Sequence, residues 1–580
     1  MTGHGAEIVA SVRPRARGFS LRGTSPAVVA SALVLLVLIV PPTIFLIQTS
    51  LHETMPDGSF GAFTFKYFVN IVSNPRLLGN LGNNVVYALG AAAVAITIGT
   101  TLAWIVERTN TPMRRWVFLL SIVSLGIPSV LYTVSFLLIL GKAGPVNDLL
   151  RMAFGAGGPT VNVYSLWGMI VVEGIDFSPL AFLLLSSVFR SNDASFEEAS
   201  LMSGAGLWKT FKNITLRLAM PGILALLILV LIRAFESFEI PALVGRPGRV
   251  YVLTTDIYDS IQTQVPPNYG EAGAFSIVLL VFVVLLLTLY NRLSRRAERF
   301  QTITGKGFRP RVVDLGKWRY ATAAALVVLF VILIGLPLAI VLYASFLPYY
   351  DGVRLAAFSQ MTFDNYRHVW AGASFRGSIG NTIILGVVTA SIVGPFTALC
   401  AWLAVRRVKG GALLDQLATA PLIFPAIVMG VAFLHLFLHL PFPFYGTLAS
   451  VILASSVRFL PYGMRYSYAG VLQIHKELEE ASSMSGARQR TTFIRVVLPL
   501  VAPAIVTCWL FVFLVSVKAV AMAILLVGPG SQVVAVTLFD LWDNGQVTEL
   551  SAMGVSWTAL MTAVSVAFYM IARRYGLQVR

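Results

Sequence analysis

Charged side chains inside long apolar stretches are the feature of this sequence that could do chemistry. A charge held in hydrocarbon is costly, so such residues face a protein interior or a water-filled cavity, where they pair with one another or mark a pathway. Acids and bases are both present, which allows pairing between helices or the lining of a substrate path. The seven residues are Glu173, Asp176, Arg233, Glu236, Glu239, Arg458 and Lys518.

Four of these charges correspond in position at an offset of 282 residues. Asp176 corresponds to Arg458 and Glu236 to Lys518, so each charge meets an opposite charge at the equivalent position. If these positions face a common axis, we expect each pair to neutralise itself across the interface and hold two halves of the chain in register. The alternative is that the charges line a substrate path. The three charges without a charged counterpart are Glu173, Arg233 and Glu239.

Two histidines offer the only candidate metal ligands. His435 and His439 are four residues apart and therefore share one face of a helix. Such a spacing can hold a metal. Their place near the outer end of an aromatic-rich helix favours an interfacial role instead, so no metal site is assigned. The two cysteines, Cys400 and Cys508, lie in apolar stretches and are expected to be packing residues.

A polar stretch of the sequence occurs twice, again at an offset of 282 residues. It runs from Glu198 to Pro221 and from Glu480 to Pro503, and about half of its positions are identical. Glu-Ala-Ser followed by polar residues predicts a short helix along a membrane surface. The glycine that follows allows a sharp turn and a close approach. The shared positions are Glu198, Ala199 and Gly204 in the first copy and Glu480, Ala481 and Gly486 in the second.

Composition requires a membrane around these elements. Of the 580 residues 57% are hydrophobic and only 12% are charged, and the mean hydropathy is +0.79. Apolar runs of about 20 residues recur, each long enough to cross a bilayer. The net charge of +17 fits cationic cytoplasmic loops, and no basic domain interleaved with aromatic residues points to nucleic acid.

The predicted fold is all-α: a polytopic membrane protein of about twelve spans in two parallel six-helix repeats. Residues 1–26 form a cytoplasmic tail, 27–291 the first half, 292–319 a basic cytoplasmic linker and 320–580 the second half. The polar loops are 191–220 and 469–500. The N- and C-termini are both expected in the cytoplasm. The spans are expected at about 27–48, 84–106, 117–140, 166–190, 221–242, 273–291, 321–346, 381–404, 417–440, 446–468, 501–526 and 551–572.

The repeated stretch resembles the coupling loop of type I ABC importer permeases, with the pattern E-A-A-x-x-x-G-x9-I-x-L-P. The second copy matches through Pro499, with Val496 in place of Ile, whereas the first has Arg217 where the family has Pro. The resemblance covers most of the chain, in a form with both halves fused. It implies that Glu198, Ala199, Gly204, Glu480, Ala481 and Gly486 couple the chain to ATPase subunits.

Further expectations follow from that resemblance. It implies two copies of a cytoplasmic ATPase, an extracytoplasmic substrate-binding protein, a bacterial inner membrane and transport by alternating access. No G-x-x-x-x-G-K-[ST] loop is present. We therefore expect no nucleotide site and no enzymatic activity on this chain, no cofactor of its own, and ATP with magnesium on the partner subunits.

The cargo is suggested by a more specific resemblance. Phe235–Pro241, Gly245–Gly248 and Leu253–Tyr258, together with the fused layout, are similar to permeases of ferric-iron importers. Relatives of this branch carry thiamine, phosphonates or polyamines, which remain alternatives. A different class, the proton-coupled secondary transporters, predicts a Gly/Asp/Arg loop between the second and third spans. Glu107–Arg115 does not have that character, and that class gives no reason for two coupling loops.

Overall fold

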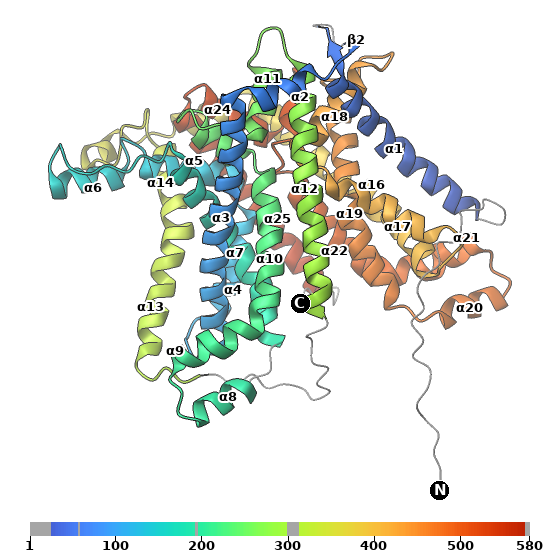
Figure 1. Cartoon of the computed structure of the whole chain (residues 1–580), viewed down its shortest axis with the longest axis horizontal. Coiled ribbons are helices and arrows are strands. Elements are labelled where there is room, and N and C mark those ends of the chain that lie inside the picture. Colours follow the sequence, from blue (N-terminus) through green and yellow to red (C-terminus); the bar gives the residue numbers. More distant parts are fainter. Residues whose placement is uncertain (1–24, 56–58, 192–194, 299–312, 575–580) are drawn as a thin grey trace.

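Helices make up almost all of the described chain, as the all-α prediction requires. The computed structural model describes residues 25–55, 59–191, 195–298 and 313–574. Nearly all of the predicted tail 1–26 and half of the predicted linker 292–319 therefore lie outside the described residues. Within them, the one sheet is an antiparallel hairpin of β1 (His52–Thr54) and β2 (Phe60–Phe63). Long helices run side by side and short helices lie across their ends (Figure 1).

The first half contains the following helices, in chain order: α1 (Pro26–Leu51), α2 (Lys66–Ser73), α3 (Pro75–Arg108), α4 (Arg114–Gly126), α5 (Ser129–Leu140), α6 (Pro145–Phe154), α7 (Leu166–Ser191), α8 (Ser195–Met202), α9 (Leu207–Thr210), η1 (Phe211–Thr215), α10 (Leu216–Glu236), η2 (Pro241–Gly245), α11 (Leu253–Gln262) and α12 (Tyr269–Glu298).

The second half repeats this plan without a counterpart of α6: α13 (Trp318–Phe330), η3 (Val331–Gly335), α14 (Leu336–Ser345), η4 (Leu355–Gln360), α15 (Asp364–Ala371), α16 (Ala373–Val405), α17 (Gly411–Thr419), η5 (Ala420–Ile423), α18 (Ala426–Leu438), α19 (Leu448–Leu472), α20 (Glu477–Met484), α21 (Gln489–Thr492), η6 (Phe493–Val497), α22 (Leu498–Ser516), α23 (Ala523–Leu526), α24 (Val534–Asp543) and α25 (Val547–Arg574).

The spans agree with a polytopic membrane protein. Among the described residues nine helical stretches are long and apolar enough to cross a membrane, or ten if α17–η5 and α18 count as one bent span. α19 and α25, with 25 and 28 residues, also have the length that a span needs. Each of the predicted ranges overlaps one of these helices or helix runs.

Two ranges predicted as continuous helices are broken. The range 117–140 is split between α4 and α5, where Ile127 is extended before Pro128. The range 417–440 is split where Phe424 is extended before Pro425, and its two parts are bent by 104°. The cause is the same in both halves, because proline disfavours a helical conformation of the residue before it. A further helix, α6, lies between the predicted spans 117–140 and 166–190.

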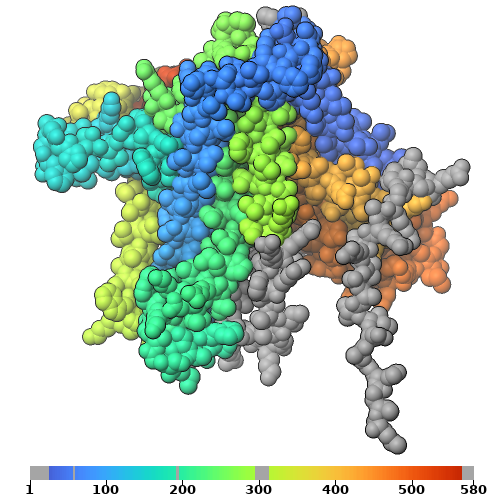
Figure 2. All heavy atoms as spheres, in the orientation of Figure 1, coloured from blue at the N-terminus to red at the C-terminus, as the bar shows by residue number. Residues whose placement is uncertain are grey.

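The two halves are interlocked by their first spans. α1 packs against α17 and α18 of the second half, and α14 packs against α5 of the first. Figure 2 shows α1, in dark blue, lying over the orange helices of the second half. Inside each half the main contacts are α3 with α7 and α16 with α19. α8 and α20 lie at the end of the bundle away from the β-hairpin (Figure 1).

Candidate functional site

A polar cavity of about 160 Å³ lies between the two halves. α7 and α10 of the first half line it, and so do α19 and the segment after α22 of the second. Its volume has room for several water molecules. All seven charged residues singled out in the sequence contribute to its wall: Glu173, Asp176, Arg233, Glu236, Glu239, Arg458 and Lys518.

Opposite charges attract across this cavity, but with partners other than those predicted. Asp176 is attracted most strongly by Lys518, and Glu236 by Arg233 on its own helix and Arg458 on the other half. The charges that attract one another in this way lie on the fourth span of one half and on the fifth of the other. The pairing of Asp176 with Arg458 and of Glu236 with Lys518 stays a prediction.

The two basic residues of the second half also satisfy backbone carbonyls at the broken third spans. Lys518 Nζ donates to the Leu125 carbonyl near the end of α4. Arg458 donates to the Phe424 carbonyl, 3.3 Å away, directly before Pro425. A helix end leaves carbonyls without an intrahelical partner. These charges therefore stabilise the breaks as well as the cavity wall.

Glu173 is held inside the first half. Its Oε2 accepts hydrogen bonds from the Tyr87 hydroxyl at 2.7 Å and from the Ser237 hydroxyl at 3.1 Å, and its side chain is buried. A buried carboxyl with two hydroxyl donors is a satisfied structural group. Among the cavity residues, Glu173 thus has its own local partners.

Contacts between the halves continue beside the cavity, at the end that carries the hairpin. The ring of Phe238 packs 5.8 Å from Phe539, and Tyr258 packs 5.9 Å from the same ring. Arg246 lies 3.0 Å from Asp259 and 3.7 Å from Asp543 of the other half. These contacts, which join α24 to α11 and to the segment between α10 and α11, hold the halves together at the end of the bundle that carries the hairpin.

Burial also acts on the acids of this outer region. It raises the pKa of Asp259, although the Arg246 guanidinium opposes the shift. Burial and the nearby Asp543 carboxylate raise the pKa of Asp540 to about 6.

The first predicted coupling helix, α8, is clamped to the end of α3. Glu197 is buried, accepts a hydrogen bond from the Thr215 hydroxyl at 2.9 Å and lies 3.7 Å from the Arg108 guanidinium. The Trp104 ring, one turn earlier on α3, packs 4.8 Å from Phe211 at the start of η1. An acid and an aromatic ring thus fix the predicted coupling loop to a spanning helix.

The second predicted coupling helix, α20, has the same clamp on the end of α16. Glu479 Oε1 accepts a hydrogen bond from Arg406 Nε at 2.7 Å and lies 2.6 Å from a second Arg406 nitrogen, and its Oε2 accepts from the Trp402 indole at 2.9 Å. The Trp402 ring packs 5.0 Å from Phe493. Arg406 also donates to the Ile474 carbonyl at 3.0 Å. Both oxygens of the Glu479 carboxylate therefore have donors.

The predicted coupling residues lie on the open side of these helices. Gly204 and Gly486 have φ of +81° and +82°, which favours glycine, and a side chain there would meet nothing within 4 Å. Glu480 pairs with Lys476 at 2.8 Å, and Glu198 is partly exposed. The remaining exposed positions are Ala199 and Ala481.

The sequence reasoning missed the clamps. Glu197 and Glu479, one residue before the predicted acids, are the ones that hold the loops. Their partners Arg108 and Arg406 are 298 residues apart rather than 282, and so are Trp104 and Trp402. The two halves differ in loop length before the predicted coupling loops, so equivalent residues there are 298 residues apart. A search of the sequence for this second offset would have found the clamp residues.

The histidine pair is an aromatic contact. The His439 ring stacks on Phe60 at 4.8 Å, and its Nδ1 lies 2.8 Å from the His435 carbonyl. His435 is buried, with its ring edge-on to Tyr269 at 5.1 Å. Across the described ranges no group of three or more His, Cys, Asp or Glu side chains could hold a metal ion.

Two like halves around a polar cavity, each with a surface helix clamped to a spanning helix, define a transport permease. The chain belongs to the family of binding-protein-dependent transport system inner membrane components, whose profile matches residues 95–300 and again 386–577. It is therefore an ABC importer permease in which both halves are fused, with the type I domain present twice.

Curated relatives include two ferric permeases. The ferric transport system permease protein FbpB of Actinobacillus pleuropneumoniae is 26% identical over 87% of this chain and 71% of its own length. The putative ferric transport system permease protein FbpB 1 of Haemophilus influenzae is 27% identical over 87% and 79%. The putative 2-aminoethylphosphonate permease protein PhnU of Salmonella choleraesuis is 27% identical over 45% of this chain and 91% of its own.

A solved structure with similarity is a bacterial ABC transporter involved in the import of the acidic polysaccharide alginate. It is 20% identical over 46% of this chain and 93% of that chain, with a TM-score of 0.38.

Proposed function

We propose that this permease moves ferric iron into the cytoplasm, driven by ATP hydrolysis on partner subunits. The observation that carries the proposal is the extent of the ferric relatives, which match along 87% of the chain. The phosphonate relative matches 45% of it. The protein then lies in a bacterial inner membrane, with both termini and the basic linker on the cytoplasmic side.

The exposed side of each coupling helix supports docking of an ATPase. Met202 and Met484 occupy equivalent positions and are 87% and 89% exposed. Phe196 and Leu478, also equivalent, are about half exposed. Clustered apolar side chains on a surface outside the membrane mark an interaction site. Each ATPase subunit, with its own ATP and magnesium, takes one such helix.

Motion of the ATPases reaches the cavity through the clamps. A pull on α8 or α20 is transmitted by Glu197 to α3 and by Glu479 to α16, the helices that pack on α7 and α19 of the cavity wall. Nucleotide binding biases the equilibrium between two arrangements of the halves. In the arrangement described here the outer contacts are closed, and a loaded extracytoplasmic binding protein opens them. The seven cavity residues line the path.

A second cargo is supported by the cavity itself. Acids from the first half face bases from the second, which suits a zwitterion such as 2-aminoethylphosphonate, the compound named for the half-length relative. The test is uptake by proteoliposomes that hold the permease with its ATPase and binding protein. ATP-dependent uptake of ferric iron supports the proposal. Uptake of 2-aminoethylphosphonate without iron overturns the ferric assignment and keeps the transporter class.

A further inference from the structure

The inserted helix α6 has no counterpart in the second half and projects sideways from the bundle. Only Gly141–Gly144 separates it from the end of the buried helix α5. It lies across the direction of the long spans, at the outer part of the molecule (Figure 1). α6 therefore starts where a span ends and continues roughly parallel to the membrane plane.

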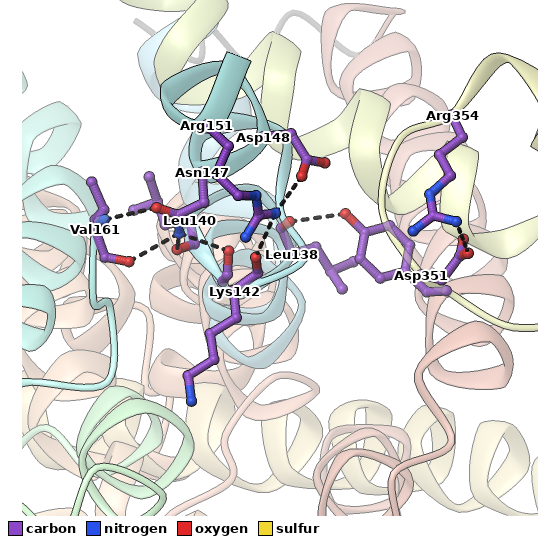
Figure 3. A network of polar contacts seen from close by, with 11 residues as sticks. Leu138, Leu140, Lys142, Asn147, Asp148, Arg151, Val161, Asp351 and Arg354 are labelled. Atoms are coloured by element: carbon purple, nitrogen blue, oxygen red, sulfur yellow. Dashed lines mark hydrogen bonds and ion pairs between the residues drawn. The ribbon is translucent and has the colours of Figure 1, made fainter. Parts of the chain in front are cut away.

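The polar side of α6 is used in contacts with its own loop. Asn147 is buried and donates to the carbonyls of Leu140, Gly141 and Val161 at 2.9–3.0 Å, and its Oδ1 accepts from the Val161 amide at 2.7 Å. Arg151 pairs with Asp148 and donates to the Lys142 carbonyl at 3.1 Å (Figure 3). These contacts fix which side of the helix faces the protein.

The apolar side of α6 faces away from the described protein. Leu149 and Met152, three residues apart on one face, are 65% and 81% exposed, and Phe154 at the end of the helix is 64% exposed. A short helix with one tied polar side and one open apolar side is typical of a segment that lies in a membrane interface.

The helices near α6 indicate that lipid covers its apolar face. α5 packs against α14, and the span formed by α13, η3 and α14 exposes Val328, Ile332 and Leu342, as lipid-facing spans do. α5, α14 and α25 also line an apolar cavity of about 690 Å³, which Leu342 borders. The open face of α6 thus belongs to the same hydrocarbon-facing side of the molecule.

The second half braces the base of α6. The Tyr350 hydroxyl donates to the Leu138 carbonyl at 2.9 Å, and Figure 3 shows Leu138 and the Asp351–Arg354 pair of the second half. Gly352 packs so closely on the turn before α6 that an added Cβ would lie 2.7 Å from the Ala143 carbonyl. Both halves therefore hold the position of this helix.

From these contacts we propose that α6 is a membrane-surface anchor whose Leu149, Met152 and Phe154 insert into the outer leaflet, at the boundary of headgroups and acyl chains. The charged pair Asp148–Arg151 stays at headgroup level. The anchor fixes the height of the first half in the bilayer while the two halves move. It is a property of this chain that does not depend on which cargo is carried.

The test uses the full chain in lipid nanodiscs, labelled with an environment-sensitive fluorophore at one introduced cysteine. The native Cys400 and Cys508 are buried, so labelling favours the new site. Met152→Cys reports the apolar face, and Phe154→Cys is a second probe if the first variant inserts poorly. Val265→Cys is the water-facing control, because this residue is 96% exposed in the loop between α11 and α12.

We expect nitroxide lipids labelled on upper acyl carbons to quench the Met152→Cys probe severalfold more than the Val265→Cys probe, and aqueous iodide to show the opposite order. Equal iodide quenching at both positions would overturn the proposal. If iodide quenches the Met152→Cys probe strongly and this quenching falls only when the extracytoplasmic binding protein is added, the face belongs to that protein. This result would also overturn the proposal.

Discussion

The two halves share one fold but contribute opposite charges to the cavity between them. The first half supplies four carboxylates and Arg233, whereas the second supplies only Arg458 and Lys518. The clamps that hold α8 and α20 also differ between the two halves. Glu197 in the first half has a fully buried arginine and a threonine as partners, and Glu479 in the second has a tryptophan and an arginine that contacts it through two nitrogens.

This difference shows that the two halves keep the clamp at equivalent positions but use different hydrogen-bond donors to the glutamate. The threonine at position 215 corresponds to Val497, so the second clamp lacks that hydroxyl and uses the Trp402 indole instead. The first half adds Glu107, buried at the end of α3, which pairs with Arg114 at 2.5 Å and Arg190 at 2.8 Å. The end of α3 that holds the first predicted coupling loop therefore carries a second cluster of ion pairs, in which Glu107 is buried and its two arginines are exposed.

The largest expected effect comes from removing the clamp arginines. Arg108→Ala leaves Glu197 buried without its cation, which should cost about 3–5 kcal/mol. Arg406→Ala leaves Glu479 partly exposed and still bonded to Trp402, which should cost about 1–3 kcal/mol. Thermal unfolding of the two purified variants measures the difference. Equal losses would show that the two clamps are energetically alike.

The coupling turns should respond alike in both halves. Gly204→Val and Gly486→Val each place a branched side chain at positive φ, at a cost of about 1–2 kcal/mol, and should lower ATP-coupled uptake. The control is Gly206→Ala, where φ is −67° and the second half already carries Arg488. If Gly206→Ala lowers uptake as much as the two valine variants do, the backbone conformation of Gly204 and Gly486 does not explain the loss.

Across the cavity, Asp176 should interact with Lys518, as the structure indicates, rather than with Arg458, its equivalent position in the repeat. Asp176→Asn with Lys518→Met should show a coupling free energy on the order of 1 kcal/mol in a double-mutant cycle. The matched cycle of Asp176→Asn with Arg458→Met should be close to additive. Folded yield and thermal unfolding in detergent provide the data. A larger coupling to Arg458 than to Lys518 would restore the pairing predicted from sequence.

The sequence was sufficient for what depends on local pattern. Apolar length predicted the spans, and the cost of intramembrane charge selected seven residues that line one cavity. Partners across space were harder, because the offset of 282 residues says which positions are equivalent and not which positions touch. The offset therefore leaves the partner of Asp176 open between Arg458 and Lys518. The clamps were missed because α3 and α8 are far apart in the chain, and the breaks before Pro128 and Pro425 because a proline in an apolar run also suits a kinked continuous helix.

The central claim is that the clamps carry motion from the ATPases to the cavity helices. Its most direct test compares ATP hydrolysis with ferric uptake in proteoliposomes for Glu479→Gln, with Glu477→Gln, exposed on the same helix, as the control. We predict that Glu479→Gln lowers the uptake per ATP hydrolysed severalfold while hydrolysis continues, and that Glu477→Gln does not. An unchanged ratio in Glu479→Gln would contradict the claim.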